Sequence, residues 1–320
     1  MQTVSRPVVT VARVLLPAGL GPLQERAEVR QGGLGARREE VLALAPGSVA
    51  VVADPSVSVD AALLDAAGEQ LRLVANFAVG YDNVDLDACH ERGVRVTNTP
   101  DVLTNATAEL ALTLTLAAAR LLSEAERDLR AGRWSGWDPA AYLGLELSGA
   151  SVGVVGLGRI GSRYAELVGG FGVELLYTAR SPKPEAEERL GANRAELEEL
   201  LERADVVSLH VPASPETHYL IDAAALKRMK PAAVLVNTSR GALVDLAALA
   251  EALREGRIGA AGLDVYEHEP DVPAEILEAP HTALAPHIGS ATVKARDGMA
   301  RTVAENVIAV LEGREPPNPV

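Results

Sequence analysis

The stretch SVGVVGLGRIG, from Ser151 to Gly161, is an apolar run followed by glycines in the G-x-G-x-x-G spacing. In a chain with 28 glycines this spacing alone is a weak signal. Here a strand-like run leads in, a helix-like segment leads out, and a second strand-like run follows at 173–178. In such a turn Gly156 permits the sharp bend, Gly158 lets the backbone approach a pyrophosphate, and Gly161 allows close packing of helix on strand. The stretch therefore predicts a Rossmann-type domain that binds a dinucleotide.

On both sides of this stretch, short apolar runs alternate with helix-like segments. Strands are predicted at 11–16, 48–54, 71–79 and 94–99, and then at 151–156, 173–178, 206–211, 233–239, 261–266 and 282–288. This alternation predicts parallel sheets covered by helices on both faces.

Two longer helices are predicted outside the strand-rich runs. Residues 104–134 have a helical period and no glycine or proline until Gly132, which predicts a core helix that continues into an arm. A last helix is predicted at 291–313, closed by Gly313.

Length and composition limit the class of protein. A chain of 320 residues is long enough for two core-bearing domains, and its net charge of −14 argues against a nucleic-acid surface. No apolar run reaches the roughly 18 residues of a membrane span, and the first ten residues lack a signal-peptide core, so a cytoplasmic protein is expected. Cys89 is the single cysteine and is predicted to be a core residue of a short helix. No metal site is predicted.

The residues after the second strand of the dinucleotide fold bear on the cofactor. NAD sites place an Asp or Glu there, where it accepts hydrogen bonds from the ribose 2′-OH, whereas a carboxylate would repel a 2′-phosphate. This chain has Thr178 at that position, followed by Arg180, Ser181 and Lys183, which offer donors and positive charge. The pattern predicts a preference for NADP(H), with NAD(H) possible. The alternative is that Arg180 is an ordinary solvated arginine.

Three further motifs follow predicted strands: NTSRG with Arg240, GLDVYEHEP with Glu269, and APHIGS with His287. Reduction of a 2-oxo acid needs a fixed cation for the carboxylate and carbonyl, a proton donor that works near neutral pH, and an anion that orients that donor. Arg, His and Glu meet these needs. Taken singly they could be a surface charge, a core histidine and a loop carboxylate. Their occurrence at successive strand ends favours a catalytic set.

Together with NFAVGYDNVDL and TPDVLTNATAELAL, these motifs resemble the D-isomer-specific 2-hydroxyacid dehydrogenase family, in particular its glyoxylate/hydroxypyruvate reductase branch. The similarity runs from about Val49 to the C-terminus. It implies an α/β protein of two doubly wound parallel-sheet domains, the larger a Rossmann domain inserted into a flavodoxin-like substrate domain. The implied bounds are 1–100 with 289–320 for the substrate domain and 101–288 for the cofactor domain. The latter would include a dimerisation helix and arm at about 105–147.

The resemblance also implies roles for single residues. Arg240 would bind the substrate carboxylate and carbonyl, His287 would be the acid/base, and Glu269 would be its partner. Other implied substrate contacts are Val79, Gly80, Asp264 and Ser290. The implied cofactor contacts are Gly156, Leu157, Gly158, Arg159, Ile160, Gly161, Thr178, Ala179, Arg180, Ser181, Pro212, Thr238, Asp264 and Gly289.

The expected reaction is reduction of glyoxylate or hydroxypyruvate by NADPH to glycolate or D-glycerate. A broader D-lactate-type dehydrogenase is the alternative within the family. The stretch VVADPSVSVD lacks the basic residues of a phosphoglycerate dehydrogenase, and Glu269 argues against a formate dehydrogenase. A non-catalytic NAD(P)-sensing regulator is a further alternative. Family members are usually homodimers, which makes Trp134 and Trp137 candidate interface or core residues. Ala141, where relatives carry bulkier residues, would leave more room near a substrate.

Overall fold

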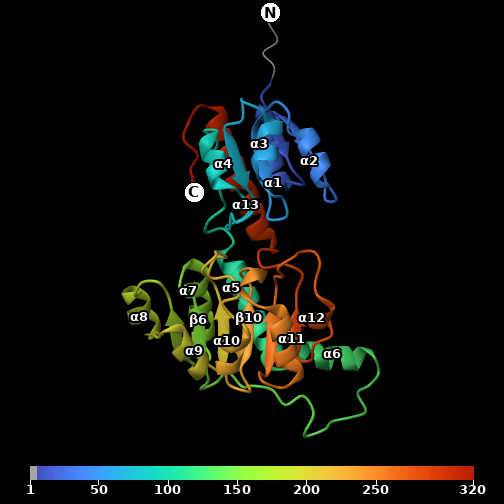
Figure 1. Ribbon diagram of the computed structural model, residues 1–320, viewed down its shortest axis with the longest axis vertical. Coiled ribbons are helices and arrows are strands. Elements are labelled where there is room, and N and C mark those ends of the chain that lie inside the picture. The colour runs from blue at the N-terminus through green and yellow to red at the C-terminus, as the bar shows by residue number, and fades with distance from the viewer. Residues whose placement is uncertain (1–5) are drawn as a thin grey trace, which may run out of the picture. The chain divides into compact units, whose positions relative to one another are not determined.

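The computed structural model describes residues 6–320, which form two units. One unit runs to Leu103 and resumes at Ser290, and the other comprises Thr104–Gly289 (Figure 1). The first five residues lie outside the described part of the chain. The first strand follows directly, at Val8–Val11.

The smaller unit is a five-stranded parallel sheet in the order β2-β1-β3-β4-β5. Its strands are β1 (Val8–Val11), β2 (Glu28–Gln31), β3 (Ser48–Ala53), β4 (Leu73–Asn76) and β5 (Arg95–Thr97). Its helices are α1 (Pro17–Arg26), α2 (Arg38–Leu44), α3 (Ala61–Ala67), α4 (Leu86–Glu91) and α13 (Val293–Leu311). Helices α1 and α13 pack against each other, and α13 also packs on β3 and β4. The apolar residues of α2, α3 and α4 form a separate core with the sheet.

The larger unit is a seven-stranded parallel sheet in the order β12-β11-β10-β9-β6-β7-β8. Its strands are β6 (Ser151–Val155), β7 (Glu174–Thr178), β8 (Asn193–Arg194), β9 (Val206–Leu209), β10 (Val234–Asn237), β11 (Ala260–Leu263) and β12 (Thr282–Leu284). Its helices are α5 (Thr104–Ala119), α6 (Leu122–Arg130), α7 (Arg159–Gly169), α8 (Pro184–Leu190), α9 (Leu197–Arg203), α10 (Ala223–Arg228), α11 (Leu246–Arg254) and α12 (Ala274–Leu277), with a 3₁₀ turn η1 (Gly241–Leu243).

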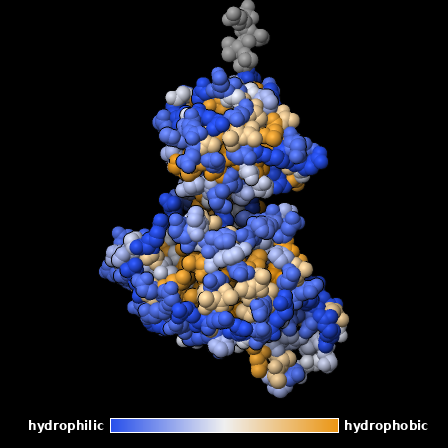
Figure 2. Space-filling view, in the orientation of Figure 1, coloured by the Kyte–Doolittle hydropathy of each residue, from blue (hydrophilic) through white to orange (hydrophobic). Residues whose placement is uncertain are grey.

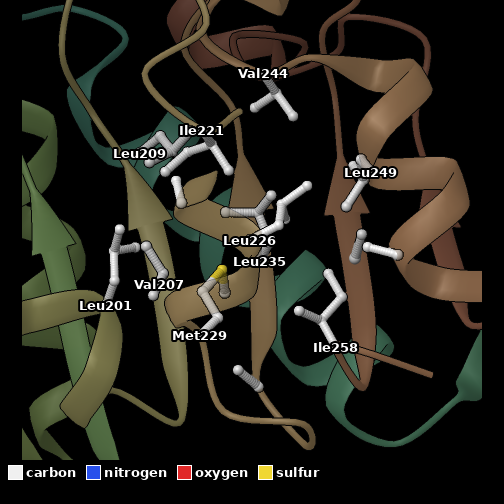
Figure 3. Packing of buried hydrophobic residues seen from close by; sticks show 14 of the residues in the cluster. Leu201, Val207, Leu209, Ile221, Leu226, Met229, Leu235, Val244, Leu249 and Ile258 are labelled. Atoms are coloured by element: carbon white, nitrogen blue, oxygen red, sulfur yellow. The ribbon is translucent and has the colours of Figure 1, made fainter. Parts of the chain in front are cut away.

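Two apolar cores lie on opposite faces of this larger sheet, because alternate residues of each strand point to opposite sides. Helices α5 and α7 cover one face, where Val152, Val154 and Tyr164 are buried. Helices α9, α10 and α11 cover the other, where Leu235 and its neighbours interdigitate (Figure 3). Most of the visible surface of each unit is hydrophilic, with hydrophobic residues scattered over it (Figure 2).

The predicted α/β class, with two parallel sheets flanked by helices, is confirmed. The strand predicted at 11–16 was wrong: β1 ends at Val11, and the apolar run continues past the sheet because Ala12 and Leu15 are buried in the loop. Strands β2 and β8 were not predicted. Both are edge strands, and apart from the half-buried Val29 their residues are polar, so they give no apolar alternation. Cys89 is buried in α4, as predicted, and burial raises the pKa of its thiol to about 11.

The long helix predicted at 104–134 is broken. Leu121 has a φ of +49°, a left-handed conformation that ends one helix and turns the next by 67°. Helix α5 packs in the core, while α6 buries none of its residues and extends with the following segment away from the sheet of its unit (Figure 1). Across residues 6–320 no single helix is long and apolar enough to cross a membrane. Helices α5 and α6 meet the two criteria of length and apolar character only when they are counted together as one bent pair.

Candidate active site

The glycine turn after β6 has the shape that the motif predicts. Gly156 has a φ of +94°, and a Cβ there would lie 2.7 Å from Val211 and 2.8 Å from the carbonyl oxygen of His210. A Cβ on Gly161 would lie 2.0 Å from the Gly156 carbonyl oxygen. Around Gly158, the N-cap of α7, no atom lies within 4 Å of an added Cβ. The start of an 11-residue helix, with its unpaired N–H groups, is therefore open to an anion, which fits a dinucleotide pyrophosphate.

One neighbouring observation supports the same fit. The Oγ1 atom of Thr238, just after β10, is buried without a hydrogen-bond partner in residues 6–320. Leu157, by contrast, buries its side chain in the core and offers only backbone atoms. Pro212 is exposed, and its carbonyl accepts a hydrogen bond from Thr217 at 2.9 Å. Arg159 is exposed and Ile160 is half-buried at the start of α7.

The loop after β7 carries basic side chains and no carboxylate. The strand ends at Thr178, Ala179 follows half-buried, and Arg180 and Ser181 are exposed. Arg194 of β8 donates to the carbonyl of Ala179 at 3.2 Å, so a second guanidinium holds the backbone directly before Arg180. The charge of Arg180 also contributes, after the Ser214 hydroxyl, to lowering the pKa of the Glu216 carboxyl.

A hollow of about 330 Å³ lies between this loop and the start of α7. Its lining comprises Leu157, Ser162, Pro182, Lys183, Pro184, Glu185, Ala186 and Arg189. The Tyr177 hydroxyl holds the loop in place, since it accepts a hydrogen bond from the backbone N–H of Lys183 at 2.9 Å and donates one to the Glu187 carboxylate.

His287 and Glu269 form a close side-chain pair. The Nδ1 atom of His287 lies 2.6 Å from Oε2 of Glu269, and the two side chains are 35% and 32% exposed. The other carboxylate oxygen of Glu269 accepts from the backbone N–H of Tyr266 at 2.9 Å. Burial raises the pKa of Glu269, but the hydrogen bonds from His287 and Tyr266 and the charge of Arg240 outweigh it, so the pKa is lowered overall. Glu269 is therefore an ionised partner for the imidazole.

Arg240 is brought to this pair by the turn after β10. The backbone of Gly241 packs against the 266–267 segment so closely that an added Cβ would lie 1.9 Å from the Tyr266 carbonyl carbon. Asn237, at the end of β10, donates to the Arg240 carbonyl at 2.8 Å and accepts from the Ser239 N–H at 3.0 Å. These contacts fix the turn that carries the guanidinium.

Asp264 organises the turn that carries His287. Its side chain is fully buried and accepts from the N–H groups of Ile288 at 2.7 Å and Gly289 at 2.8 Å. Its carbonyl accepts from the N–H of His287 at 2.8 Å, and His287 adopts a φ of +54°. Burial raises the pKa of Asp264 despite these hydrogen bonds.

The remaining predicted substrate residues lie in the smaller unit. The carbonyl of Val79 accepts from the side chain of Asn98 and that of Gly80 from Asn76, each at 2.8 Å. These bonds fix the loop and leave the two N–H groups without a hydrogen bond among the described residues. Ser290 begins the second segment of this unit. No group of three or more His, Cys, Asp or Glu residues within 6–320 is arranged to hold a metal ion.

Sequence reasoning missed the contacts that hold the site in shape. Asn237 is the first residue of NTSRG and could have been singled out, because polar residues at strand ends commonly cap turns. The backbone contacts of Tyr266 and Asp264 leave no comparable pattern in the sequence.

With this geometry in place, the comparison with known proteins decides the family. The family model of the D-isomer specific 2-hydroxyacid dehydrogenase NAD binding domain matches residues 112–289, more than half of the chain. The chain belongs to the D-isomer specific 2-hydroxyacid dehydrogenase family.

Within this dehydrogenase family the chain falls in the glyoxylate reductase branch. It is 46% identical to a glyoxylate reductase of Thermococcus onnurineus over 318 residues, covering 98% of this chain and 95% of that protein. A glyoxylate reductase of Thermococcus litoralis is 50% identical over 264 residues, covering 81% and 80%. The chain also resembles the structure of an NADPH-dependent glyoxylate/hydroxypyruvate reductase from Sinorhizobium meliloti in complex with NADP and malonate. That match has a TM-score of 0.88 and 38% identity, with 99% and 97% of the two chains covered. This dehydrogenase is thus an NAD(P)-dependent oxidoreductase acting on a CH–OH group.

Proposed function

We propose that the enzyme reduces glyoxylate and hydroxypyruvate to glycolate and D-glycerate, with NADPH as the preferred cofactor. The observation that carries this proposal is the His287–Glu269 pair beside Arg240, at the ends of adjacent parallel strands. The glyoxylate reductases among its relatives support the choice of substrate.

In the proposed mechanism, bound NADPH supplies the hydride for the 2-oxo carbon. Arg240 holds the substrate carboxylate and polarises the carbonyl, for which a guanidinium fork is well suited. The Nε2 atom of His287 has no hydrogen-bond partner among the described residues and is the proton donor to the carbonyl oxygen. Glu269, bonded to Nδ1, favours the charged imidazole and fixes its orientation.

The substrate panel for this proposal is glyoxylate, hydroxypyruvate and pyruvate, each with NADPH or NADH, followed by cofactor absorbance. Rapid turnover of the first two is expected. Comparable or faster turnover of pyruvate would favour the broader D-lactate-type dehydrogenase. Cofactor binding without turnover of any acid would favour an NAD(P)-sensing regulator.

Replacing Arg180 by alanine is expected to lower kcat/KM with NADPH about 10-fold to 100-fold, because a charge-assisted contact with the 2′-phosphate is lost. The value with NADH should change by less than about threefold, since NADH lacks that phosphate. Both are measured by steady-state kinetics with saturating glyoxylate. The matched control is Arg257→Ala, which removes an exposed arginine paired with Glu255. Equal losses with the two cofactors would place Arg180 away from the 2′-phosphate.

Replacing Glu269 by glutamine is expected to lower kcat about 10-fold to 100-fold and to remove the acid-side decline that titration of this carboxylate causes. In this variant His287 loses the carboxylate that fixes the orientation of its ring. In the wild type the pKa of Glu269 is lowered, so its carboxylate stays ionised at pH values below the ordinary Glu range. The effect of this carboxylate on kcat is lost only as the pH falls through that lowered pKa. The pH profile of kcat for both proteins is the measurement, and superimposable profiles would contradict the pairing.

We also propose a cytoplasmic homodimer joined through α5, α6 and the following segment. Trp134 and Trp137 are 59% and 84% exposed, so neither is a core residue of the single chain. Burial of two such aromatic side chains would favour association. Sedimentation of the wild type and of a Trp134→Ser, Trp137→Ser variant tests this assembly. In such a dimer Ala141, in the same segment, would leave more room for the substrate than the bulkier residues expected in relatives.

A further inference from the structure

The buried tyrosine of β7 is a residue that the proposed mechanism does not use. Tyr177 has no exposed surface and packs in the core between the larger sheet and α7. For packing alone, phenylalanine would fill the same space. A buried hydroxyl is costly unless it is hydrogen-bonded, so the partners of this hydroxyl show what the tyrosine is for.

Both partners of the Tyr177 hydroxyl lie in the segment that follows β7. The hydroxyl accepts from the backbone N–H of Lys183 at 2.9 Å, because a backbone N–H can only donate. Its own proton then goes to the carboxylate of Glu187, in the first turn of α8. Burial and the hydrogen bond to Glu187 raise the pKa of Tyr177, so the hydroxyl keeps this proton at physiological pH.

These bonds hold the far end of the loop that carries Arg180. We call residues 179–183 the β7–α8 loop. At its start, Arg194 of β8 donates to the carbonyl of Ala179 at 3.2 Å, and at its end Lys183 is bound to the buried hydroxyl. A proline on either side of Lys183 restricts the backbone further. Arg180 therefore extends from a loop that is fixed on both sides of it.

A fixed loop favours the cofactor that carries the extra phosphate. A guanidinium whose backbone is already ordered loses less conformational entropy when it binds a phosphate. NADH has no 2′-phosphate and gains nothing from this ordering. A looser β7–α8 loop should therefore weaken NADPH binding and leave NADH binding nearly unchanged.

We propose that Tyr177 is a positioning residue for cofactor choice: its hydroxyl, oriented by Glu187, fixes the β7–α8 loop so that Arg180 meets the 2′-phosphate of NADPH. Tyr177 itself touches neither the cofactor nor the substrate in this assignment. The inference rests on the contact between Arg180 and the 2′-phosphate, which is part of the proposed function.

The first test is the affinity for each cofactor, measured by the fluorescence of NADPH or NADH without substrate. Tyr177→Phe should raise the Kd for NADPH about fivefold and the Kd for NADH by less than about twofold. The matched control is Tyr164→Phe, an equally buried tyrosine of the same core whose hydroxyl lies 2.9 Å from Oγ1 of Thr115, outside the loop. The control should keep the wild-type ratio of the two Kd values. An unchanged ratio in Tyr177→Phe, or the same altered ratio in Tyr164→Phe, would overturn the proposal.

A double-mutant cycle shows whether Tyr177 acts through Arg180. When Tyr177→Phe is added to Arg180→Ala, the Kd for NADPH should change by less than about twofold, because the loop then has no guanidinium to position. A further loss as large as in the wild-type background would contradict the assignment.

The loop itself is tested by amide hydrogen exchange in the protein without cofactor. Pro182 and Pro184 have no N–H, so deuterium taken up by residues 182–184 reports on Lys183 alone. This amide should exchange about 10-fold faster in Tyr177→Phe than in the wild type, because its hydrogen bond to a buried hydroxyl is lost. Mass spectrometry with fragmentation of the peptide measures the uptake, and equal rates in the two proteins would refute the proposal.

A second pair of variants covers the case that Tyr177→Phe does not fold. Glu187→Gln and Glu187→Ala both remove the charge of a half-buried side chain, but glutamine retains an oxygen that can accept from the Tyr177 hydroxyl. The alanine variant should bind NADPH about threefold more weakly than the glutamine variant, with equal affinities for NADH. Equal NADPH affinities in this pair would exclude the role of Glu187 and with it the proposal.

Failure of the proposed function has a different signature. If Arg180 does not meet the 2′-phosphate, Arg180→Ala changes the affinities for NADPH and NADH alike. If this inference alone fails, Arg180→Ala is selective for NADPH and Tyr177→Phe is not. The exchange rate of the Lys183 amide decides in both cases whether the hydroxyl fixes the loop.

Discussion

His287→Asn is expected to lower kcat for glyoxylate reduction about 10³-fold, the usual contribution of a positioned general acid. Asparagine preserves polarity and fits the same space, but it cannot supply a proton near neutral pH. The KM for NADPH should change little because the glycine turn is untouched. Steady-state kinetics with saturating cofactor measures the effect.

The matched control is His90→Asn, an exposed histidine of α4 in the smaller unit, which should keep wild-type turnover. Far-UV circular dichroism and the thermal midpoint show whether the His287 variant is folded. A folded His287→Asn protein with more than about a tenth of wild-type kcat would exclude the proton-donor role.

Arg240→Ala is expected to lower kcat/KM for glyoxylate about 10³-fold, because one guanidinium both anchors the carboxylate and stabilises charge on the carbonyl oxygen. Arg240→Lys keeps the charge but loses the planar fork, so a loss of about 10²-fold is expected. Part of the alanine loss should appear as a higher KM for the acid, since the carboxylate contact is also made in the ground state.

An exposed arginine of α10 provides the comparison for this series. Arg228→Ala removes a surface ion pair with Glu202 and should leave kinetics unchanged. Undiminished kcat/KM in a folded Arg240→Ala protein would refute the assignment of Arg240.

The grouping of Arg240, Glu269 and His287 could be anticipated because parallel strands end at one edge of a sheet. The structure places β10, β11 and β12 side by side, so residues that follow these strands gather there. The family resemblance implies that Glu269 is the partner of His287, whereas the 2.6 Å distance between Nδ1 and Oε2 comes from the structure alone. It depends on the buried Asp264 side chain, which binds the N–H groups of Ile288 and Gly289 and is visible only in three dimensions.

Other features of the fold left weaker signals or none. The apolar period of residues 104–134 predicted a helix but did not show that Leu121 would break it, since no glycine or proline marks the position. Strands β2 and β8 are polar edges that gain their structure from pairing with β1 and β7.

The most direct test of the account is to follow the hydride itself. The enzyme is incubated with glyoxylate and NADPH deuterated at the transferred position, and the product is examined by mass spectrometry. The account predicts glycolate with one deuterium on C2, formed by the wild type and Arg228→Ala and nearly abolished in His287→Asn. Absence of glycolate, or glycolate without deuterium, would contradict it.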